Sequence, residues 1–243
     1  MNQPFEPLAA RSSVRTLVAS KVRELVNEGL GNPDVLPFWV GEPDEPTPEF
    51  IRKAGAQAIE ACDTFYTHNL GIPPLREELA RYITRLHRPT SSDNIAVTSA
   101  GVNALMLVSQ LLLDPGDRVV EVTPLWPNLV EIPRILSANV ECVTLKFSNS
   151  GWALDLDELL AALKPGTRAL YINSPNNPTG WTLSVAEQRT ILDTAAGTGS
   201  GSLLTTPTSA SITARTVRWP LRSSTSPTRG IAWSAPTPFR SPG

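Results

Sequence analysis

Cysteine and histidine are scarce in this chain of 243 residues, which holds two of each. Cys62 and Cys142 are too few for a disulfide framework or a cysteine-based zinc site, and we expect both to pack in the core as small apolar residues. His68 and His87 are too few and too far apart for a metal site. The sequence therefore predicts neither a metal centre nor a disulfide-rich fold.

Long apolar runs and an excess of basic residues are also missing. No run approaches the roughly 18 apolar residues that span a bilayer, and the first residues, MNQPFEPLAARSS, lack the apolar centre of a signal peptide. The net charge of -2 gives no reason to expect a nucleic-acid partner. We therefore expect a cytoplasmic protein that binds neither membrane nor nucleic acid.

The end of the chain lacks acidic residues altogether. All 23 acids lie within residues 1–193, which carry a net charge of -7, whereas residues 194–243 hold five arginines, no lysine and no acid. The same 50 residues contain 19 Ser and Thr and six Pro. Globular domains are roughly 25% charged with both signs mixed. One interpretation of this segment is a disordered, low-complexity tail.

Before that segment, helical and strand patterns alternate. We expect helices over residues 47–61, 73–87, 102–113, 127–137, 155–164 and 184–193, and strands over residues 94–98, 118–122, 140–145 and 168–173. Capping boxes at Asp155 with Glu158, and at Ser184 with Glu187, mark the last two helix starts. Strands separated by helices predict an α/β fold with a mostly parallel sheet and helices on both faces. Ligands of such sheets bind at the carboxyl ends of the strands.

Three loops after strands carry candidate chemistry. In TSAGVNAL, residues 98–105, small residues lead into a helix N-terminus that favours phosphate, although such turns are more often simply tight. In TPLWPN, residues 123–128, a tryptophan could stack on a flat ligand or cover the sheet edge. In SPNNPTG, residues 174–180, Asn176 and Asn177 offer amides that donate and accept. The last loop is far more specific than the other two.

Two upstream strings, VGEPD at residues 40–44 and YTHNLGIPPLR at residues 66–76, complete a recognisable order of motifs. In that order the chain resembles a class I/II aminotransferase, a fold-type-I pyridoxal 5'-phosphate enzyme of the aspartate aminotransferase superfamily. The resemblance covers roughly residues 11–193. It implies transfer of an amino group between an amino acid and a 2-oxo acid, a place in amino acid metabolism, and a homodimer.

The resemblance also implies contacts to the cofactor. The backbone of Ala100, Gly101 and Val102 would hold the phosphate, Trp126 would stack on the ring, and Asn177 would donate to the ring hydroxyl. The family often has a second small residue or a lysine where Val102 stands, so a side-chain contact to the phosphate is lost here while a backbone contact survives.

Further residues follow from the same resemblance. Tyr66 would reach the phosphate of the neighbouring subunit, and Gly41 would lie beside the α-carboxylate of the substrate. The chain would divide into an N-terminal segment at 1–40, a partial large domain that binds pyridoxal 5'-phosphate at 41–193, and an irregular tail at 194–243.

Two elements of the family are missing from the tail: an aspartate for the pyridinium nitrogen and a lysine for the Schiff base. No acid follows Asp193 and no lysine follows Lys164. The lysines present, Lys21, Lys53, Lys146 and Lys164, fall on positions that we expect to be exposed or helical, so none is assigned a catalytic role. We therefore expect the chain as printed to be inactive.

A shifted reading frame accounts for the tail. Codons built from the last base of one codon and the first two of the next permit HCRRHGIWLLADDAYERLYY over 194–213, with A-D-D-A-Y at 204–208. They also permit APSFLDIADPEDRVV within 219–234 and N-T-F-S-K-S over 237–242. The shifted frame restores the family's aspartate, tyrosine and lysine in order, and we expect a frameshifted, truncated C-terminus.

Two alternatives stay open from the sequence. One is a lyase or decarboxylase that uses pyridoxal 5'-phosphate on the same scaffold, because fold does not fix reaction. The other is a non-catalytic binding protein with a disordered basic tail.

Overall fold

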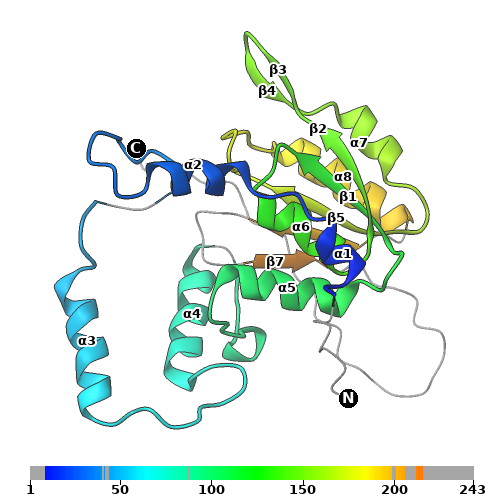
Figure 1. Cartoon of the computed structure of the whole chain (residues 1–243). Coiled ribbons are helices and arrows are strands. Elements are labelled where there is room, and N and C mark those ends of the chain that lie inside the picture. Colours follow the sequence, from blue (N-terminus) through cyan, green and yellow to red (C-terminus); the bar gives the residue numbers. More distant parts are fainter. Residues whose placement is uncertain are drawn as a thin grey trace, which may run out of the picture.

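A five-stranded sheet forms the centre of the molecule in a computed structural model, which describes residues 9–39, 41, 44–86, 88–198, 201–205 and 212–215. The strands lie in the order β2-β1-β5-β6-β7 (Figure 1). Their bounds are β1 Arg118–Thr123, β2 Asn139–Thr144, β5 Thr167–Asn173, β6 Gly201–Thr205 and β7 Ile212–Arg215. The first four are parallel, and β7 pairs antiparallel with β6. The expected α/β fold with a mostly parallel sheet is confirmed.

Strands β1 and β5 lie inside the sheet because their sequences are apolar on both faces. Residues 119–122 of β1 are fully buried, and six of the seven residues of β5 are buried. Strand β2 lies at one edge of the sheet, and Val143 is its one buried residue while the others are half-buried or exposed. Continuous apolar runs are typical of central strands in parallel sheets, as the two interior strands show.

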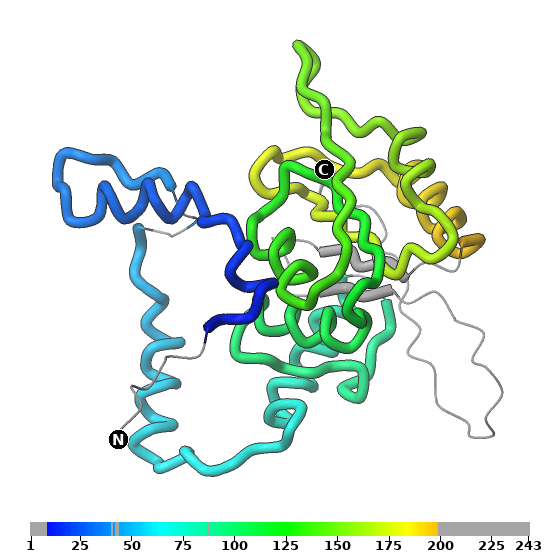
Figure 2. The backbone as a smooth tube through the Cα atoms, turned by 45° about the vertical axis from the view of Figure 1, so that its right-hand side comes forward, coloured from blue at the N-terminus to red at the C-terminus, as the bar shows by residue number. Residues whose placement is uncertain are grey.

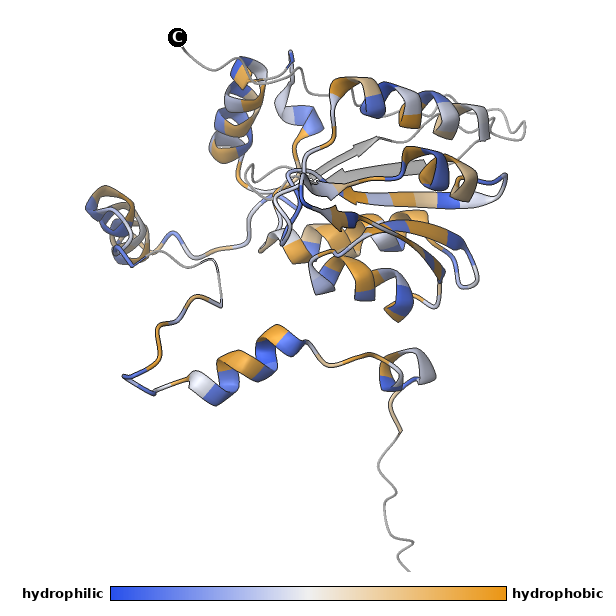
Figure 3. Ribbon diagram, turned by 90° about the horizontal axis from the view of Figure 1, so that it is seen from above, coloured by the Kyte–Doolittle hydropathy of each residue, from blue (hydrophilic) through white to orange (hydrophobic). Residues whose placement is uncertain are grey.

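Helices cover both faces of the sheet (Figure 3). Helices α5 (Gly101–Leu112) and α6 (Pro127–Ile135) pack on one face, where Leu105 and Leu129 join a buried cluster with Val119 and Tyr171. Helices α7 (Leu156–Ala162) and α8 (Val185–Thr198) cover the other face, where their buried residues join Val120 and Val122. Since successive strand residues face opposite sides, one strand feeds both cores.

In the described part of the chain, four helices precede this body (Figures 1 and 2). They are α1 Ser12–Arg15, α2 Lys21–Gly29, α3 Glu49–Glu60 and α4 Pro73–Leu86. Helix α1 reaches α6 through Arg11 and Ser13, whose side chains each donate to the carbonyl of Ile135 at 3.3 Å. Helices α2 and α3 stand apart from the sheet in both views.

The structure corrects the strand expected over residues 94–98. This segment contains a 3-10 turn, η1 (Ser92–Asn94), and then extended chain that belongs to no sheet. In the described part of the chain, one backbone hydrogen bond joins it to another segment, from the Val97 N–H to the carbonyl of Leu70 at 2.9 Å. A strand needs a neighbouring strand for its backbone groups, and no described strand lies beside this segment.

Other differences concern short elements. A hairpin, β3 (Lys146–Ser148) with β4 (Gly151–Ala153), extends from the sheet and was not expected. Irregular chain was expected from residue 194 onward, yet α8 continues to Thr198, and β6 and β7 extend the sheet. The shifted readings over 219–234 and 237–242 lie outside the described residues, as does His87.

The cysteine expectation was wrong, since Cys62 and Cys142 are both exposed. Cys62 lies in the turn after α3, a helix that does not pack on the sheet, and Cys142 lies on the edge strand β2. Among the described residues, no helix is both long and apolar enough to cross a bilayer, and no group of potential ligands is suited to a metal ion.

Candidate functional site

The loop of residues 98–105 opens helix α5 as expected. Ala100 is the N-cap residue with extended backbone (φ -160°, ψ 160°), and it has no side chain that could cap the helix. The first backbone N–H groups of a helix lack partners within the helix, and the helix dipole favours an anion there. A Cβ placed on Gly101 would meet no atom within 4 Å. The start of α5 is therefore open to a phosphate, while Val102 is half-buried beneath it.

The chain that leads to this turn is fastened to helix α4. Arg76 is only 9% exposed, and its guanidinium donates to the carbonyls of Ile95 at 2.9 Å and Ser92 at 2.8 Å. Gly71 has φ +98°, and a Cβ there would lie 2.7 Å from Cβ of Val97. Arginine and glycine at these positions therefore let the segment before α5 approach α4 closely.

Trp126 is the N-cap residue of α6, just beyond the carboxyl end of β1. It is half-buried and packs against the cluster that contains Leu105 of α5 and Leu129 of α6. The sequence left open whether this tryptophan stacks on a ligand or covers the sheet. One side of it does pack on the core, and its exposed part lies at the sheet edge where a ligand is expected.

The SPNNPTG loop follows β5 and turns around Asn176. The Asn176 side chain accepts hydrogen bonds from the N–H and the hydroxyl of Thr179, at 3.2 and 2.9 Å. The backbone of Asn176 bonds to Trp181 and Gly180, both at 2.8 Å. Asn177 is exposed, so its amide is accessible from solvent. The peptide bonds before Pro175 and Pro178 in this loop are cis, as is the bond before Pro124.

All three loops meet at one edge of the sheet. Ser109 of α5 bonds to the hydroxyl of Tyr171 on β5 at 2.7 Å, and Arg168 donates to the carbonyl of Leu112, so α5 runs antiparallel to β5. Gly101 lies eight residues before Ser109, about 12 Å along the helix, whereas β5 continues only about 7 Å beyond Tyr171. The start of α5 therefore projects past the carboxyl end of β5.

A direct bond joins the other two loops at this edge. The Nδ2 of Asn176 donates to the carbonyl of Pro124 at 3.1 Å. This donor set, with free helix N–H groups, a flat indole and an exposed amide, fits a ligand that carries a phosphate on a polar aromatic ring.

Two predicted residues are not brought to this edge by described contacts. Tyr66 lies in the long loop between α3 and α4 with its side chain entirely exposed. Gly41 is exposed too, in the connection between α2 and α3. Both residues lie in the connections between helices α2, α3 and α4. Their predicted roles therefore require contacts other than those described at the edge of the sheet.

Strand β6 occupies the place where the shifted reading puts the family's aspartate. Thr205 pairs with Asn173 at the carboxyl end of β5. In the shifted frame, the codon at position 205 would give the first acid of A-D-D-A-Y. The threonine found at this position is not ionisable in the physiological range, so position 205 provides no acid for a ring nitrogen.

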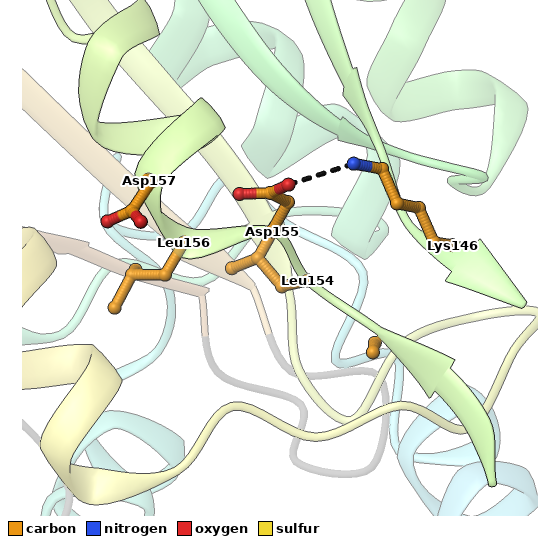
Figure 4. A pocket seen from close by; sticks show the side chains of 6 residues that line it. Lys146, Leu154, Asp155, Leu156 and Asp157 are labelled. Atoms are coloured by element: carbon orange, nitrogen blue, oxygen red, sulfur yellow. Dashed lines mark hydrogen bonds and ion pairs between the residues drawn. The ribbon is translucent and has the colours of Figure 1, made fainter. Parts of the chain in front are cut away.

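The four lysines are exposed as expected, and none belongs to the loops at this edge. Lys146, in the hairpin β3-β4, lines an open hollow of about 390 Å³ with residues 153–157 (Figure 4). Its ammonium donates to Asp155 at 2.8 Å and lies 3.4 Å from Glu158. The bond to Asp155 raises the pKa of Lys146 and lowers that of Asp155. A lysine held charged by two carboxylates is a poor nucleophile, so we assign the hollow no chemistry.

Glu121 is a buried acid that the sequence did not single out. It is fully buried in β1, and neither carboxylate oxygen has a hydrogen-bond partner in the described part of the chain. Burial raises the pKa of Glu121 to about 8, which Arg134 partly opposes and Glu131 reinforces. Its ladder neighbours are Cys142 on β2 and Tyr171 on β5, and burial raises the pKa of Tyr171 to about 12. One signal was available: a single acid inside an otherwise apolar central strand.

Comparison with known proteins gives consistent results. The chain is 34% identical over 177 residues to the aspartate aminotransferase of Pyrococcus horikoshii, which covers 72% of this chain and 45% of that protein. It is 36% identical over 174 residues to the aspartate/prephenate aminotransferase of Thermus thermophilus, covering 71% and 44%. The chain thus spans about half the length of the curated relatives it matches.

Solved structures agree with these relatives. The aspartate aminotransferase of Thermus thermophilus with maleate superposes with a TM-score of 0.72 at 29% identity, covering 82% of this chain and 53% of that one. The N-succinyldiaminopimelate aminotransferase of Mycobacterium tuberculosis gives 0.71 at 28%. A family model described as aminotransferase class I and II matches residues 33–200. Members of this family depend on pyridoxal 5'-phosphate. The chain therefore belongs to the class I and II aminotransferases.

Proposed function

We propose that the chain is the cofactor-binding portion of a pyridoxal 5'-phosphate-dependent aminotransferase, which moves an amino group between an amino acid and a 2-oxo acid. One observation supports this above all. The start of α5, the Trp126 loop and the SPNNPTG loop meet at the carboxyl edge of the sheet, which is where ligands of such sheets bind.

Each loop has a distinct role in the proposal. The backbone N–H groups of Ala100, Gly101 and Val102 bind the phosphate, and these three residues carry no side-chain hydroxyl of their own. The indole of Trp126 lies against the ring, and the amide of Asn177 donates to the ring hydroxyl. When bound, the cofactor supplies an electron-accepting ring to the substrate.

The remaining parts of the proposal concern a second subunit and the substrates. Tyr66, fully exposed on the loop between α3 and α4, serves the phosphate of a partner in a homodimer, and Gly41 leaves room for the substrate carboxylate. Exposed apolar side chains on α2 and α3, such as Leu25, Phe50 and Ile59, support an interface there, because exposed apolar surface often marks a contact surface. A cytoplasmic location belongs to the same proposal.

We further propose that residues 194–243 are translated out of frame, so that 1–40, 41–193 and 194–243 are the natural divisions of the chain. The family match ends at residue 200, close to the point where acidic residues cease. Sequencing the gene across the codon of Asp193 tests this. Stop codons or unrelated sequence in the shifted register would overturn it, and A-D-D-A-Y followed by F-S-K would support it.

Binding of pyridoxamine 5'-phosphate tests the proposed function directly. This form of the cofactor carries an amine in place of the aldehyde, so its binding requires no lysine. We expect saturable binding by calorimetry, weakened about tenfold by Trp126→Ala because stacking is lost. Trp152→Ala, in the hairpin β3-β4, is the matched control and should leave binding unchanged. Equal affinity of both variants would contradict the assignment.

We also propose that the chain as printed does not catalyse amino-group transfer. None of its four lysines belongs to the loops of the sheet edge, so no amine is placed to move a proton between substrate and cofactor. The test is an amino-transfer assay with the cofactor in excess. Turnover above the rate of free cofactor would overturn this part, while leaving the binding proposal in place.

A further inference from the structure

Asn176 is a buried residue inside an exposed loop. It is 5% exposed, whereas its neighbours Pro175 and Asn177 are both exposed. A buried amide needs hydrogen-bond partners, because a buried polar group without a partner destabilises the folded state. The hydrogen-bond partners of the Asn176 side chain therefore show which segments this amide connects.

The amide bonds in two directions. Its Oδ1 accepts from the N–H and hydroxyl of Thr179, within its own loop, at 3.2 and 2.9 Å. Its Nδ2 donates at 3.1 Å to the carbonyl of Pro124, 52 residues earlier in the chain. The two ends of the amide cannot be exchanged, because the carbonyl of Pro124 only accepts and the N–H of Thr179 only donates.

Backbone hydrogen bonds close the loop around Asn176, so the bond from Asn176 to Pro124 affects where the whole loop lies. The backbone of Asn176 donates to Trp181 and accepts from Gly180, each at 2.8 Å. These bonds tie the residues of the loop to one another around Asn176. A bond from the centre of the loop to Pro124 sets how far the loop lies from the segment that leads into α6.

We propose that Asn176 is a positioning residue that fixes the spacing between Trp126 and Asn177. Trp126 lies two residues beyond Pro124, and Asn177 directly follows Asn176. With the bridge intact, the indole and the exposed amide approach one aromatic ring together, one on its face and one at its edge. This inference rests on the proposed function, since the ring is that of the cofactor.

A ligand-free experiment tests the bridge itself. Asn176→Asp has the same shape and keeps both bonds from Thr179, but it faces the carbonyl of Pro124 with an acceptor and so breaks the bridge alone. We expect faster hydrogen exchange of the backbone amides in residues 123–129. Thr179→Val removes both bonds of that hydroxyl, to Oδ1 of Asn176 and from the N–H of Trp181, and it should raise exchange only in residues 176–183. Unchanged exchange of 123–129 in the Asn176→Asp protein would overturn the proposal.

A ligand experiment tests the consequence. We expect Asn176→Asp to raise the dissociation constants of pyridoxamine and of pyridoxamine 5'-phosphate by the same factor, about fivefold to tenfold. The ratio of the two constants should stay constant, because the start of α5 still holds the phosphate. A merely structural role would lower the melting temperature without this pattern. Loss of affinity for the phosphorylated form alone would contradict the inference.

The two proposals fail differently. If the parent chain binds neither compound, the proposed function is wrong, and the bridge is judged by hydrogen exchange. If the parent binds and Asn176→Asp binds equally well, the inference is wrong while the proposed function stands.

Discussion

Helices α3 and α5 each have 12 residues, yet they differ in what they bury. Helix α3 has no buried residue, and its Phe50 and Ile59 are 74% and 70% exposed. Helix α5 buries Leu105 and packs against the sheet and α6. Helix α3 carries its apolar residues on one side, whereas α5, GVNALMLVSQLL, is apolar over most of its surface, and both sequences predict a helix. The pattern therefore specifies the helix, while burial depends on a partner surface that only α5 finds here.

The same contrast separates two regions of the chain. Among the described residues between 9 and 86, three are buried, Val26, Arg76 and Ala80, whereas residues 99–198 contain both core clusters. Substitutions should therefore have strong effects in the second region and weak effects in the first.

Matched leucines give the largest difference expected between two variants at a single pH. Leu159 of α7 is fully buried, and Leu25 of α2 is 60% exposed. Leu159→Ala should lower the free energy of unfolding by about 3 kcal/mol, because it leaves a cavity. Leu25→Ala should change it by less than about 0.5 kcal/mol. Chemical denaturation measures both, and similar losses would mean that α2 is packed in solution.

Glu121 should make the packed region sensitive to pH. Its pKa is raised from 4.5 to about 8 in the folded chain, so between these values the folded state holds a proton that the unfolded state has lost. Stability should therefore fall as pH rises through this range, by up to about 1.4 kcal/mol per pH unit, and level off above pH 8.

Denaturation at pH 5.5, 7 and 8.5 measures this dependence. Glu121→Gln removes the titrating group and should flatten that part of the profile. Glu60→Gln, on exposed α3, is the control and should leave the profile as it was. A parent profile that rises between pH 5.5 and 8 would contradict the assignment.

Arg76 connects the two regions. Removing its side chain leaves the carbonyls of Ser92 and Ile95 without their donor. Arg76→Ala should cost about 1.5 kcal/mol and increase hydrogen exchange over residues 92–98. Arg81→Ala, on the same helix and ion-paired with Glu78 at the surface, is the control with little expected effect. If the two variants match, residues 92–98 are held by other contacts.

The smallest effect is expected at a surface ion pair of α3. Lys53 lies 2.8 Å from Glu49, and both side chains are about two-thirds exposed. Lys53→Ala should lower stability by about 0.5 kcal/mol or less, because water and salt screen the pair. A thermal melt at low and high salt measures it, and a large loss would show that α3 is covered in solution.

Much of the fold could be predicted from the sequence. The capping box of Ser184 and Glu187 forms both of its bonds, at 2.7 and 3.2 Å, and α8 begins directly after Ser184. In the other box, Asp155 accepts from the N–H of Glu158 at 3.1 Å. Caps are local, so four residues of sequence suffice to specify them. The strand expected at 94–98 failed because a strand depends on a neighbour, which no local pattern supplies.

The loops of the candidate site could be predicted from the sequence, but the hydrogen bonds that join them could not. The three loops were visible as motifs, because backbone N–H groups, an indole and amides have recognisable chemistry. The bond from Asn176 to Pro124 and the hold of Arg76 on residues 92–98 were invisible, because each joins segments that are distant in the chain.

By itself, the sequence determined the alternation of helix and strand, the motifs after the strands and the change of composition at residue 193, since these depend on neighbouring residues. Only the tertiary structure decided which apolar faces are covered, which asparagine of the SPNNPTG loop is buried, and that Glu121 loses all contact with water. Whether a residue is buried depends on the residues that pack against it, and these often come from distant parts of the chain. A short stretch of sequence therefore does not determine burial.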